Sequence, residues 1–407
     1  ELVDLSVAEA GSTRALAEFL QVGTPPIDHF FDLVDRILPG FEFETPPLPP
    51  MIGNGIGQGV VVREPFGVAA LITPFNFPLF LNLCKVAPAL AAGCTVVLKC
   101  SPYTPFEALV VGEIAEAAGL PPGVLNIITG DVEAGEALTT HPGVDIISFT
   151  GSDTVGTKVY GQGAVAEEGG ARARRQVGEH PPRGHRSGQG DAERARGFIT
   201  HAGQGCALMT RILVHESLHD ELVGRVKMAL DYVPVGDPAD PNVVMGPLIR
   251  EAQRARVEEL IRVGQQEGAQ IAYGGGRPAG LDKGGFFVEP TLFVGVDNGM
   301  KIAQSEIFGP PVGVVTPFSD DAEAVRIAND SPYGLSGGVW SADPPVRAHG
   351  IARQLRTGMV VVNGGGGGLM PDGPFGGYKH SGIGREFGAH GLSEYLQHKT
   401  IQWAAGR

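Results

Sequence analysis

The spacing of apolar residues alternates between two patterns along the first part of the chain. Apolar residues recur at helical spacing across Ala15–Leu38, and the proline-rich Thr45–Pro50 ends that segment. Beyond it, short apolar runs predict buried strands, and helically spaced segments between them predict helices. The expected strands are Gly59–Val62, Val68–Thr73, Thr95–Lys99, Val124–Thr129 and Asp145–Phe149, and the expected helices are Leu79–Ala92, Phe106–Gly119, Ala134–Thr139 and Ser152–Gly161. Strands that alternate with helices predict an α/β fold with a parallel, helix-covered sheet.

A segment of different composition interrupts this pattern at Val165–Arg196. It holds seven arginines, six glycines and almost no large apolar residue, with neither a helical nor a strand period. Such a composition is typical of a solvated, irregular insertion. The globular pattern then resumes, and we expect a helix over Leu218–Tyr232, strands over Arg211–His215, Gly285–Phe293, Val312–Pro317 and Thr400–Trp403, and a flexible or tightly turned run at Gly364–Gly368.

Length, charge and cysteine content narrow the class of protein. A chain of 407 residues with 43% hydrophobic content can build two or more domains. The net charge of −14 argues against a nucleic-acid-binding protein. No apolar run approaches the roughly 18 residues of a membrane span. The four cysteines have no paired spacing, which favours free thiols in the cytoplasm over disulfides or a zinc site. The chain starts at Glu1, so we expect it to begin inside a longer protein.

Two separated segments carry residues suited to acyl chemistry. Cys206 lies in the glycine-rich Gly203–Ala207, where small neighbours leave room for a substrate carbonyl. Asn76 lies in Thr73–Pro78, and its amide can donate a hydrogen bond to the oxyanion formed by thiolate attack. Taken alone, such a cysteine is more often a small core residue.

A possible phosphate site follows the strand expected at Asp145–Phe149. There Ser152 can cap the next helix, and free backbone N–H groups can face a phosphate, with Gly151 and Gly156 allowing close approach. Lys99 ends another buried strand, at the sheet edge where cofactors bind. The alternatives are a purely structural turn and a solvated lysine.

Seven motifs occur together in one order along the chain. They are Pro74-Phe75-Asn76-Phe77-Pro78, Pro88-Ala89-Leu90-Ala91-Ala92-Gly93, Val97-Leu98-Lys99, Phe149-Thr150-Gly151-Ser152, Gly203-Gln204-Gly205-Cys206, Glu306-Ile307-Phe308-Gly309-Pro310 and Pro374-Phe375-Gly376-Gly377-Tyr378-Lys379 with Ser381-Gly382. From about Gly59 to the C-terminus, except Val165–Arg196, the chain resembles the NAD(P)-dependent aldehyde dehydrogenases. Residues 1–58 fit the resemblance more loosely.

The resemblance implies a three-part fold. It implies a Rossmann-like cofactor-binding domain from residues 1–47 and 64–174, and an α/β catalytic domain from residues 175–375. A β-stranded oligomerisation arm would comprise residues 48–63 and 392–407, so a homodimer or homotetramer is expected.

The resemblance also implies residue roles. Cys206 would form a thiohemiacetal with the aldehyde, and Asn76 with the Cys206 backbone N–H would stabilise its oxyanion. Hydride transfer would leave a thioester that water hydrolyses, and Lys85 and Glu386 would lie near the proton path. The cofactor would contact Thr73, Phe75, Lys99, Ser101, Gly151, Ser152, Gly156, Glu306 and Phe308. Pro102 stands where many NAD-preferring members carry an acidic residue, so the cofactor is NAD or NADP. The alternative for Glu306 and Glu386 is a surface carboxylate.

The general-base glutamate of the family is missing from its expected place, where the chain has Arg172. The family motif Glu-Leu-Gly-Gly-Lys-Ser-Ala-Asn-Ile can be encoded as GAG CTC GGC GGC AAG TCG GCG AAC ATC. Read with one extra C in front, this DNA encodes Arg-Ala-Arg-Arg-Gln-Val-Gly-Glu-His, which is the sequence of residues 172–180. The coincidence favours a shifted reading frame over a genuine arginine-rich loop. Residues 165–196 should therefore either follow a family-like backbone with ill-fitting side chains or be irregular and exposed.

The sequence leaves two further alternatives to aldehyde oxidation. One is an acylating enzyme that passes the thioester to coenzyme A. The other is a catalytically impaired cofactor-binding relative, or a pseudogene product, that lacks the general base. The sequence does not name the aldehyde.

Overall fold

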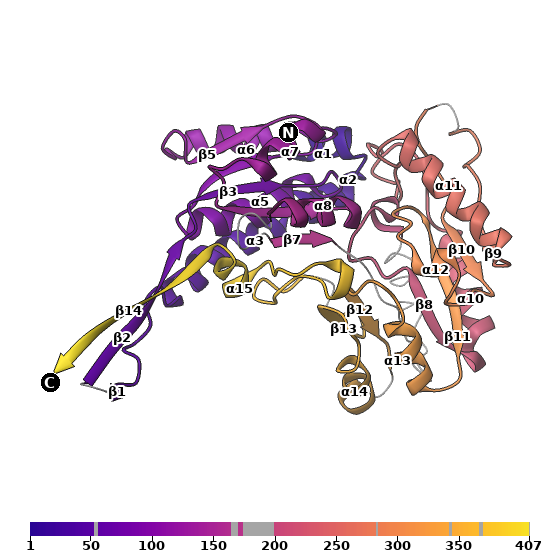
Figure 1. The fold of residues 1–407 in the computed structure, drawn as a ribbon. Helices are drawn as coiled ribbons and strands as arrows, with labels where there is room; N and C mark the ends of the chain where they lie inside the picture. Colours follow the sequence, from indigo (N-terminus) through magenta and orange to yellow (C-terminus); the bar gives the residue numbers. More distant parts are fainter. Residues whose placement is uncertain are drawn as a thin grey trace.

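The computed structural model describes residues 1–52, 56–163, 170–173, 199–281, 284–341, 344–365 and 369–406. Two α/β units with a sheet each lie side by side, and a narrow β arm projects from the first (Figure 1). The N-terminal helices pack against the first unit.

The first unit contains the expected parallel sheet. Its strands are β3 (Val68–Ile72), β4 (Thr95–Lys99), β5 (Leu125–Ile128), β6 (Ile146–Gly151) and β7 (Gly170–Ala173). They lie in the order β5-β4-β3-β6-β7 and all pairs are parallel. The chain winds outward from β3 in both directions, so the strand order reverses between β3 and β6. Ligands of open parallel sheets bind at the carboxyl ends of the strands at such a reversal.

Helices cover both faces of this sheet, as the sequence predicts. One face is covered by α5 (Pro78–Ala91) and α6 (Phe106–Ala117), and the other by α7 (Val132–Thr140) and α8 (Asp153–Gly163). The first face has a core that includes Leu71, Val86 and Leu98. The second includes Ile72, Leu138 and Phe149. Alternate residues of β3 therefore point to opposite cores, which explains its unbroken apolar sequence.

The N-terminal segment is a broken series of helices. It comprises α1 (Leu2–Ala10), α2 (Arg14–Leu16), η1 (Ala17–Gln21), α3 (Thr24–Asp32), η2 (Leu33–Ile37) and α4 (Leu38–Gly40). Helix α1 packs against α6, and α3 packs against α5. The helical spacing seen across Ala15–Leu38 thus predicts the correct structure.

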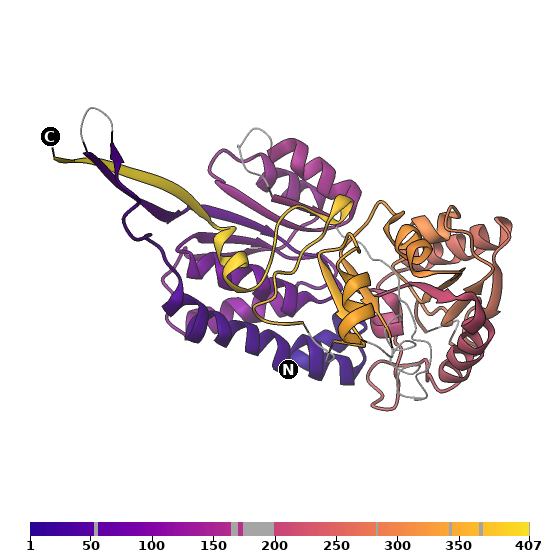
Figure 2. The same ribbon diagram turned by 90° about the horizontal axis from the view of Figure 1, so that it is seen from below.

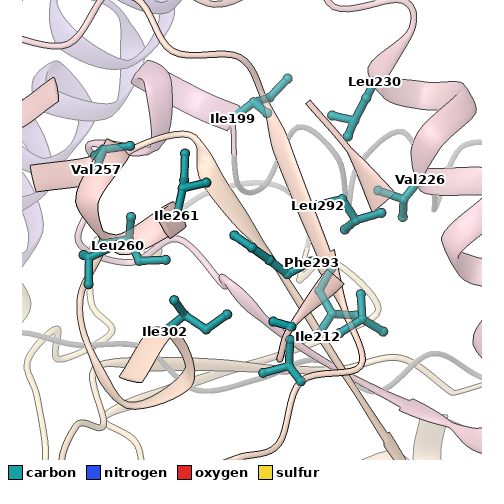
Figure 3. Packing of buried hydrophobic residues seen from close by; sticks show 14 of the residues in the cluster. Ile199, Ile212, Val226, Leu230, Val257, Leu260, Ile261, Leu292, Phe293 and Ile302 are labelled. Carbon is teal, nitrogen blue, oxygen red and sulfur yellow. The ribbon is translucent and has the colours of Figure 1, made fainter. Parts of the chain in front are cut away.

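The second unit is built on a sheet of order β8-β11-β10-β9. These strands are β8 (Arg211–His215), β9 (Gln270–Tyr273), β10 (Thr291–Val294) and β11 (Pro311–Phe318), and the helices are α10 (His219–Leu230), α11 (Glu251–Gln266), α12 (Lys301–Gln304) and α13 (Asp321–Asn329). Figure 3 shows Leu292 and Phe293 of β10 between side chains of α10 and α11. The strand expected from Gly285 is wrong for its first half, because regular pairing begins only at Thr291, after Pro290.

A smaller pair of parallel strands completes this unit. It consists of β12 (Ser336–Val339) and β13 (Met359–Val362), joined through η5 (Pro344–Ala348) and α14 (His349–Ala352). Gly364 and Gly365 follow with φ values of 82° and 59°, a tight turn that glycine adopts without strain. The rest of the expected glycine turn, residues 366–368, lies outside the described residues.

The arm is an antiparallel sheet of order β1-β2-β14. It is formed by β1 (Met51–Ile52), β2 (Ile56–Pro65) and β14 (Leu396–Gly406), with α15 (Gly388–Ser393) just before the last strand. Figure 2 shows the arm extending well beyond both units. Strand β2 contains the strand expected at Gly59–Val62 and extends to Pro65, and it belongs to a different sheet from β3.

Strand β7 lies inside the segment for which no period was visible. Its Arg172 pairs with Thr150 of β6 in parallel register. Of the two expected alternatives, a regular backbone or an irregular segment, Gly170–Ala173 thus has the regular backbone. Ladder hydrogen bonds use main-chain groups alone, so a strand can form there without an apolar sequence. Residues 164–169 and 174–198 lie outside the described residues, as do the side chains of β7.

Candidate active site

A cleft with a volume of about 480 Å³ opens at the carboxyl edge of the first sheet. Its walls come from the turn after β3, the turn after β6, the Cys206 turn, α11 and the segment before β11. The lining residues are Pro74, Phe75, Asn76, Thr150, Gly151, Ser152, Asp153, Thr154, Cys206, Arg250, Gln253, Arg256, Ser305, Glu306, Phe308 and Tyr333. The cleft thus lies where the strand order reverses, and its size suits a cofactor or substrate.

Seven of the predicted site residues line this cleft together. They are Phe75, Asn76, Gly151, Ser152, Cys206, Glu306 and Phe308. The remaining predicted residues are not in its lining: Thr73, Lys85, Lys99, Ser101, Gly156 and Glu386. The backbone of Arg172 lies on β7, beside the lining residue Thr150, and its side chain is outside the described part of the structure.

The turn that carries Cys206 is held by close backbone contacts. Gly203 has a φ of 74°, and a Cβ atom there would lie 2.0 Å from the carbonyl oxygen of Gly309. Gln204 is fully buried, and its Oε1 accepts the N–H of Ile249 at 3.0 Å. Cys206 itself is 8% exposed. The glycine brings this turn against the loop that follows Phe308, so two walls of the cleft are packed on each other.

His201 supports the same turn from within. Its φ is 52°, and its ring lies 5.4 Å from that of Phe77. Burial lowers the pKa of His201 to about 4. The imidazole is therefore neutral at pH 7 and adds no charge to the turn that carries Cys206.

Asn76 is fixed against the cysteine turn. Its side-chain Nδ2 donates to the carbonyl of Gln204 at 2.8 Å, and its own carbonyl accepts from Gln21 Nε2 at 3.2 Å. The side chain is almost completely buried. An amide NH₂ carries two N–H donors. The Asn76 amide is thus hydrogen-bonded to Gln204, which precedes Cys206 by two positions in the chain. The contact with Gln204 uses only one of its two N–H donors.

The turn after β6 has the geometry expected for binding an anion. Ser152 Oγ accepts the N–H of Val155 at 3.4 Å, and α8 starts at Asp153. Gly156 lies within α8, where its N–H donates to the Ser152 carbonyl at 2.8 Å. The first backbone N–H groups of a helix have no partner within the helix and attract negative charge. Residues 150–154 line the cleft, so this helix end faces it.

Three predicted cofactor residues near strand ends form hydrogen bonds with other groups of the protein. Thr73 Oγ1 donates to Asn82 Oδ1 at 2.6 Å, and Ser101 Oγ accepts the N–H of Tyr103 at 3.2 Å. Lys99 Nζ donates to the Cys100 carbonyl at 3.1 Å. Burial lowers the pKa of Lys99.

Phe308 and Glu306 form the opposite wall. The Phe308 ring meets the Phe75 ring edge to face, with centroids 5.9 Å apart. Its φ of 54° is unusual for a phenylalanine, and its carbonyl accepts from Gln253 Nε2 at 2.8 Å. The Glu306 carbonyl accepts from Arg256 Nη2 at 2.7 Å. Helix α11 thereby holds both residues in place.

Among the lining residues that sequence reasoning did not assign to the site are Arg250, Gln253, Arg256 and Tyr333. The first three belong to α11 or its N-cap, a helix that the sequence reading did not identify. The helical spacing of Val257, Leu260 and Ile261 could have revealed the helix. Tyr333 lies in a loop, where its OH donates to Asp153 Oδ2 at 3.1 Å, and no local pattern marks it.

Lys85 and Glu386 form a buried ion pair away from the cleft. Lys85 Nζ lies 2.7 Å from Glu386 Oε1 and donates to Ser148 Oγ at 2.8 Å. The Lys85 side chain is 0% exposed. The pair ties α5 to β6 and to the segment before α15.

All four cysteines are free and buried. Among the residues that the structure describes, no cluster of three or more histidine, cysteine or acidic side chains could hold a metal ion. Within the same residues, no helix has the length and apolar character needed to cross a membrane.

A family model and several relatives match nearly the whole chain. The model of the aldehyde dehydrogenase family matches residues 1–401, which includes the N-terminal residues that fitted the resemblance loosely. A Staphylococcus epidermidis protein whose name assigns it provisionally to the aldehyde dehydrogenases is 39% identical over 415 residues. That alignment covers 98% of this chain and 82% of the relative.

Solved structures give the same result for the fold. The aldehyde dehydrogenase of Mycobacterium tuberculosis, in complex with NAD⁺, is 40% identical with a TM-score of 0.91, covering 98% of this chain and 80% of that one. A cysteine-to-alanine mutant of aldehyde dehydrogenase C from Pseudomonas syringae, in complex with NAD⁺ and octanal, is 36% identical. Its TM-score is also 0.91, with the same coverage of the two chains.

Proposed function

The chain belongs to the aldehyde dehydrogenase family, and from this we propose that it oxidises an aldehyde to a carboxylate with NAD(P), through a covalent adduct on Cys206. The observation that carries the proposal is the meeting of Cys206 and Asn76 in one cleft at the strand-order reversal. A nucleophile, an amide donor and an anion-binding helix end are what thiol-based oxidation of an aldehyde requires.

The cleft fits a nicotinamide dinucleotide. The N-terminal end of α8, with Gly151 and Ser152, would hold the pyrophosphate, because free N–H groups and the helix dipole favour an anion there. Glu306 and Lys99 would hold the two riboses. Phe308 would pack against the nicotinamide, with Phe75 behind it. Thr73, Ser101 and Gly156 would shape the surrounding backbone. Solved relatives hold NAD⁺, which supports this assignment, while NADP is not distinguished by the lining.

The first chemical step belongs to Cys206. Its thiolate attacks the aldehyde carbon, a C–S bond forms, and the carbonyl oxygen becomes an oxyanion. Asn76 and the Cys206 backbone N–H would stabilise that charge, an effect worth about 10²–10³ in kcat for one such donor. The chemistry that NAD(P) supplies, when bound, is acceptance of the hydride that leaves the substrate carbon. A relative that carries a mercaptoethanol-modified cysteine, betaine aldehyde dehydrogenase of Staphylococcus aureus, supports a reactive thiol in this fold.

Release of the product requires a base for water, and Arg172 stands in the family's base position. A guanidinium stays protonated in proteins and cannot take a proton from water. Lys85 and Glu386 would relay protons from the buried side, but they do not line the cleft. The second candidate function follows from Arg172: a relative that binds the cofactor and turns over slowly or not at all.

The two units and the arm suggest which part of the chain binds the cofactor, which catalyses the reaction and which forms the oligomer. We assign residues 1–47 and 64–174 to cofactor binding, and residues 175–375 to catalysis. Residues 48–63 and 392–407 would form the oligomerisation arm of a homodimer or homotetramer. Exposed Met51, Ile52 and Trp403 on the arm support an interface there. Four free thiols support a reducing, cytoplasmic location.

Steady-state formation of NAD(P)H from an aldehyde tests this function. The Cys206→Ser chain should lose all measurable turnover, because a serine hydroxyl is a far weaker nucleophile than a thiolate. The matched control is Cys100→Ser. Cys100 is also buried, but it follows Lys99 in the chain and does not line the cleft. Unchanged turnover in the Cys206→Ser chain would overturn the assignment.

A further inference from the structure

We infer that Arg250 is a cofactor-binding residue, whose guanidinium reaches the cleft from the second unit and binds the diphosphate held by the N-terminal end of α8 in the first unit. Helix α8 lies in the first unit and α11, which follows Arg250, in the second (Figure 1). This inference rests on the proposed function, because it assumes that a nicotinamide dinucleotide occupies the cleft. It adds to the site a residue that none of the seven motifs contains.

The arginines of α11 and its N-cap differ in their partners. Arg254 Nη2 lies 3.6 Å from Glu251 Oε1, and Arg262 Nη2 lies 2.5 Å from Glu259 Oε1. Arg250 instead lines the cleft, and no carboxylate among the described residues forms an ion pair with it. A guanidinium stays charged in proteins. Arg250 therefore offers the cleft a positive charge that is available to an anionic ligand.

Contacts from both units hold Arg250 in place. Its Cζ lies 4.8 Å from the centre of the Tyr103 ring, and its Nη1 donates to the Tyr103 hydroxyl. The preceding residue, Ile249, donates its N–H to Gln204 Oε1 at 3.0 Å, in the turn that carries Cys206. Tyr103 belongs to the first unit, so the guanidinium reaches across from one unit to the other.

A row of aromatic rings indicates which part of the dinucleotide Arg250 would meet. The Phe308 and Phe75 rings have centroids 5.9 Å apart, and the Phe75 and Tyr103 rings 6.5 Å apart. Phe308, at one end of the row, would pack against the nicotinamide. Lys99, four residues before Tyr103, would hold the ribose of the other half. The diphosphate joins the two halves, which places it between these ends of the row, on the side where Arg250 lies over Tyr103.

The helix end in the first unit carries a negative charge of its own. Asp153 begins α8, and its Oδ1 accepts the N–H of Thr154 at 2.7 Å. That contact uses one of the first N–H groups of the helix and places a carboxylate beside the expected diphosphate. Two negative groups side by side weaken an anion site. A guanidinium from the second unit offsets this charge, because its planar fork can donate two parallel hydrogen bonds to phosphate oxygens.

Equilibrium binding, measured by titration calorimetry, tests this role without turnover. The probes are NAD⁺, NADP⁺ and ADP, which share a diphosphate and differ in the groups around it. Arg250→Gln removes the charge but keeps a polar side chain. It should weaken the binding of all three ligands by a similar factor, at least about tenfold, the usual loss for a hydrogen bond to a charged group. Arg250→Lys keeps the charge without the planar fork and should lose less.

The matched control is Arg262→Gln. Arg262 lies on the same helix, but its side chain is 53% exposed, pairs with Glu259 and does not line the cleft. This variant should bind all three ligands with the affinities of the original chain.

Salt dependence separates a lost charge from a disturbed fold. Added salt should weaken ADP binding less in Arg250→Gln than in the original chain, because one cation fewer meets the phosphates. A weaker affinity with an unchanged salt dependence would make Arg250 a structural residue and overturn the inference.

The pattern across ligands decides the remaining alternatives. Unchanged affinities in both Arg250 variants would overturn the inference and leave the proposed function intact. A loss confined to NADP⁺ would also overturn it, by assigning Arg250 to the 2′-phosphate instead of the diphosphate. Failure of the original chain to bind any of the three ligands would overturn the proposed function itself, and the inference with it.

Discussion

At the scale of single residues, Gly203 determines where the Cys206 turn can lie. It combines a φ of 74° with an approach that would put a Cβ atom 2.0 Å from a backbone oxygen of the neighbouring loop. A side chain there would both strain the backbone and push the two cleft walls apart.

Replacement of Gly203 by alanine should therefore reduce stability and Cys206 acylation together. The matched control is Gly268→Ala, because Gly268 has a φ of 104° but open space around its Cβ position. The control should lose only the left-handed backbone cost of about 1–2 kcal/mol, measured by denaturant unfolding. Gly203→Ala should lose clearly more. Equal losses would show that the contact with Gly309 does not matter.

The residues of the site differ in how far sequence could place them. Cys206 and Asn76 stand in short motifs whose chemistry is visible locally, and both line the cleft. Lys99 was expected there from its strand end and Thr73 from the family resemblance, but their polar atoms contact the protein itself. Arg250 and Tyr333 reach the cleft from distant elements. Their positions in the cleft depend on how the two units pack, and no local sequence pattern predicts that packing.

At the scale of elements, the start of α5 is held by a buried carboxylate on α6. Glu107 Oε2 accepts the N–H of Leu79 at 2.9 Å, just after the turn that carries Asn76, and Glu107 is 0% exposed. Glu9 in turn accepts the N–H of Phe106 at 2.8 Å. Burial raises the pKa of Glu107 from its ordinary 4.5 to about 7, and the nearby Glu9 charge adds to the rise.

This carboxyl should make stability depend on pH. Between pH 4.5 and 7 the folded chain keeps a proton on Glu107 that the unfolded chain has lost, so its contribution falls as pH rises. Glu107→Gln keeps an acceptor for Leu79 without titrating. Its free energy of unfolding relative to the original chain should rise by about 2–3 kcal/mol from pH 5 to pH 8.

The matched control is the exposed Glu113→Gln on the same helix, which should show little change between these pH values. Denaturant unfolding at both pH values measures the difference. A pH-independent difference for Glu107→Gln would contradict a raised pKa at this position.

Strands with strong local patterns were predictable, and weak ones were not. Thr95–Lys99 and Arg211–His215 are β-rich runs with clear ends, and the structure has strands with the same bounds. Strand β12 reads Ser-Gly-Gly-Val, whose two glycines give it a weak strand propensity, and it pairs with β13. The arm was assigned from the family resemblance, since its long-range pairing of β2 with β14 leaves no local sign.

At the scale of the whole molecule, the edge strand β7 carries Arg172, which the family resemblance puts at the position of the general base. The Arg172 backbone has the parallel register of a sheet strand. This edge strand therefore has a regular backbone, although its sequence has arginine where the family resemblance leads us to expect an acid.

Restoring Glu-Leu-Gly-Gly-Lys-Ser-Ala-Asn-Ile across residues 172–180 should raise both the melting temperature and the turnover of aldehyde. The gain in rate should be about 10²–10⁴-fold, the usual contribution of a general base. The control restores the same residues with glutamine in place of the glutamate, which should recover stability but not rate. If the original chain already matches the restored one in melting temperature and in turnover, the interpretation of residues 172–180 as a shifted reading frame is contradicted.

The most direct test of the central claim, that Cys206 is the nucleophile for aldehyde oxidation, is mass spectrometry after mixing the chain with NAD⁺ and octanal. Arg172 cannot activate water, so the thioester should persist long enough to be trapped. We predict an octanoyl group on the peptide that contains Cys206, an equal amount of NADH, and neither product in the Cys206→Ser chain. An octanoyl group on another residue, its absence from Cys206, or NADH formed by the Cys206→Ser chain would contradict the account.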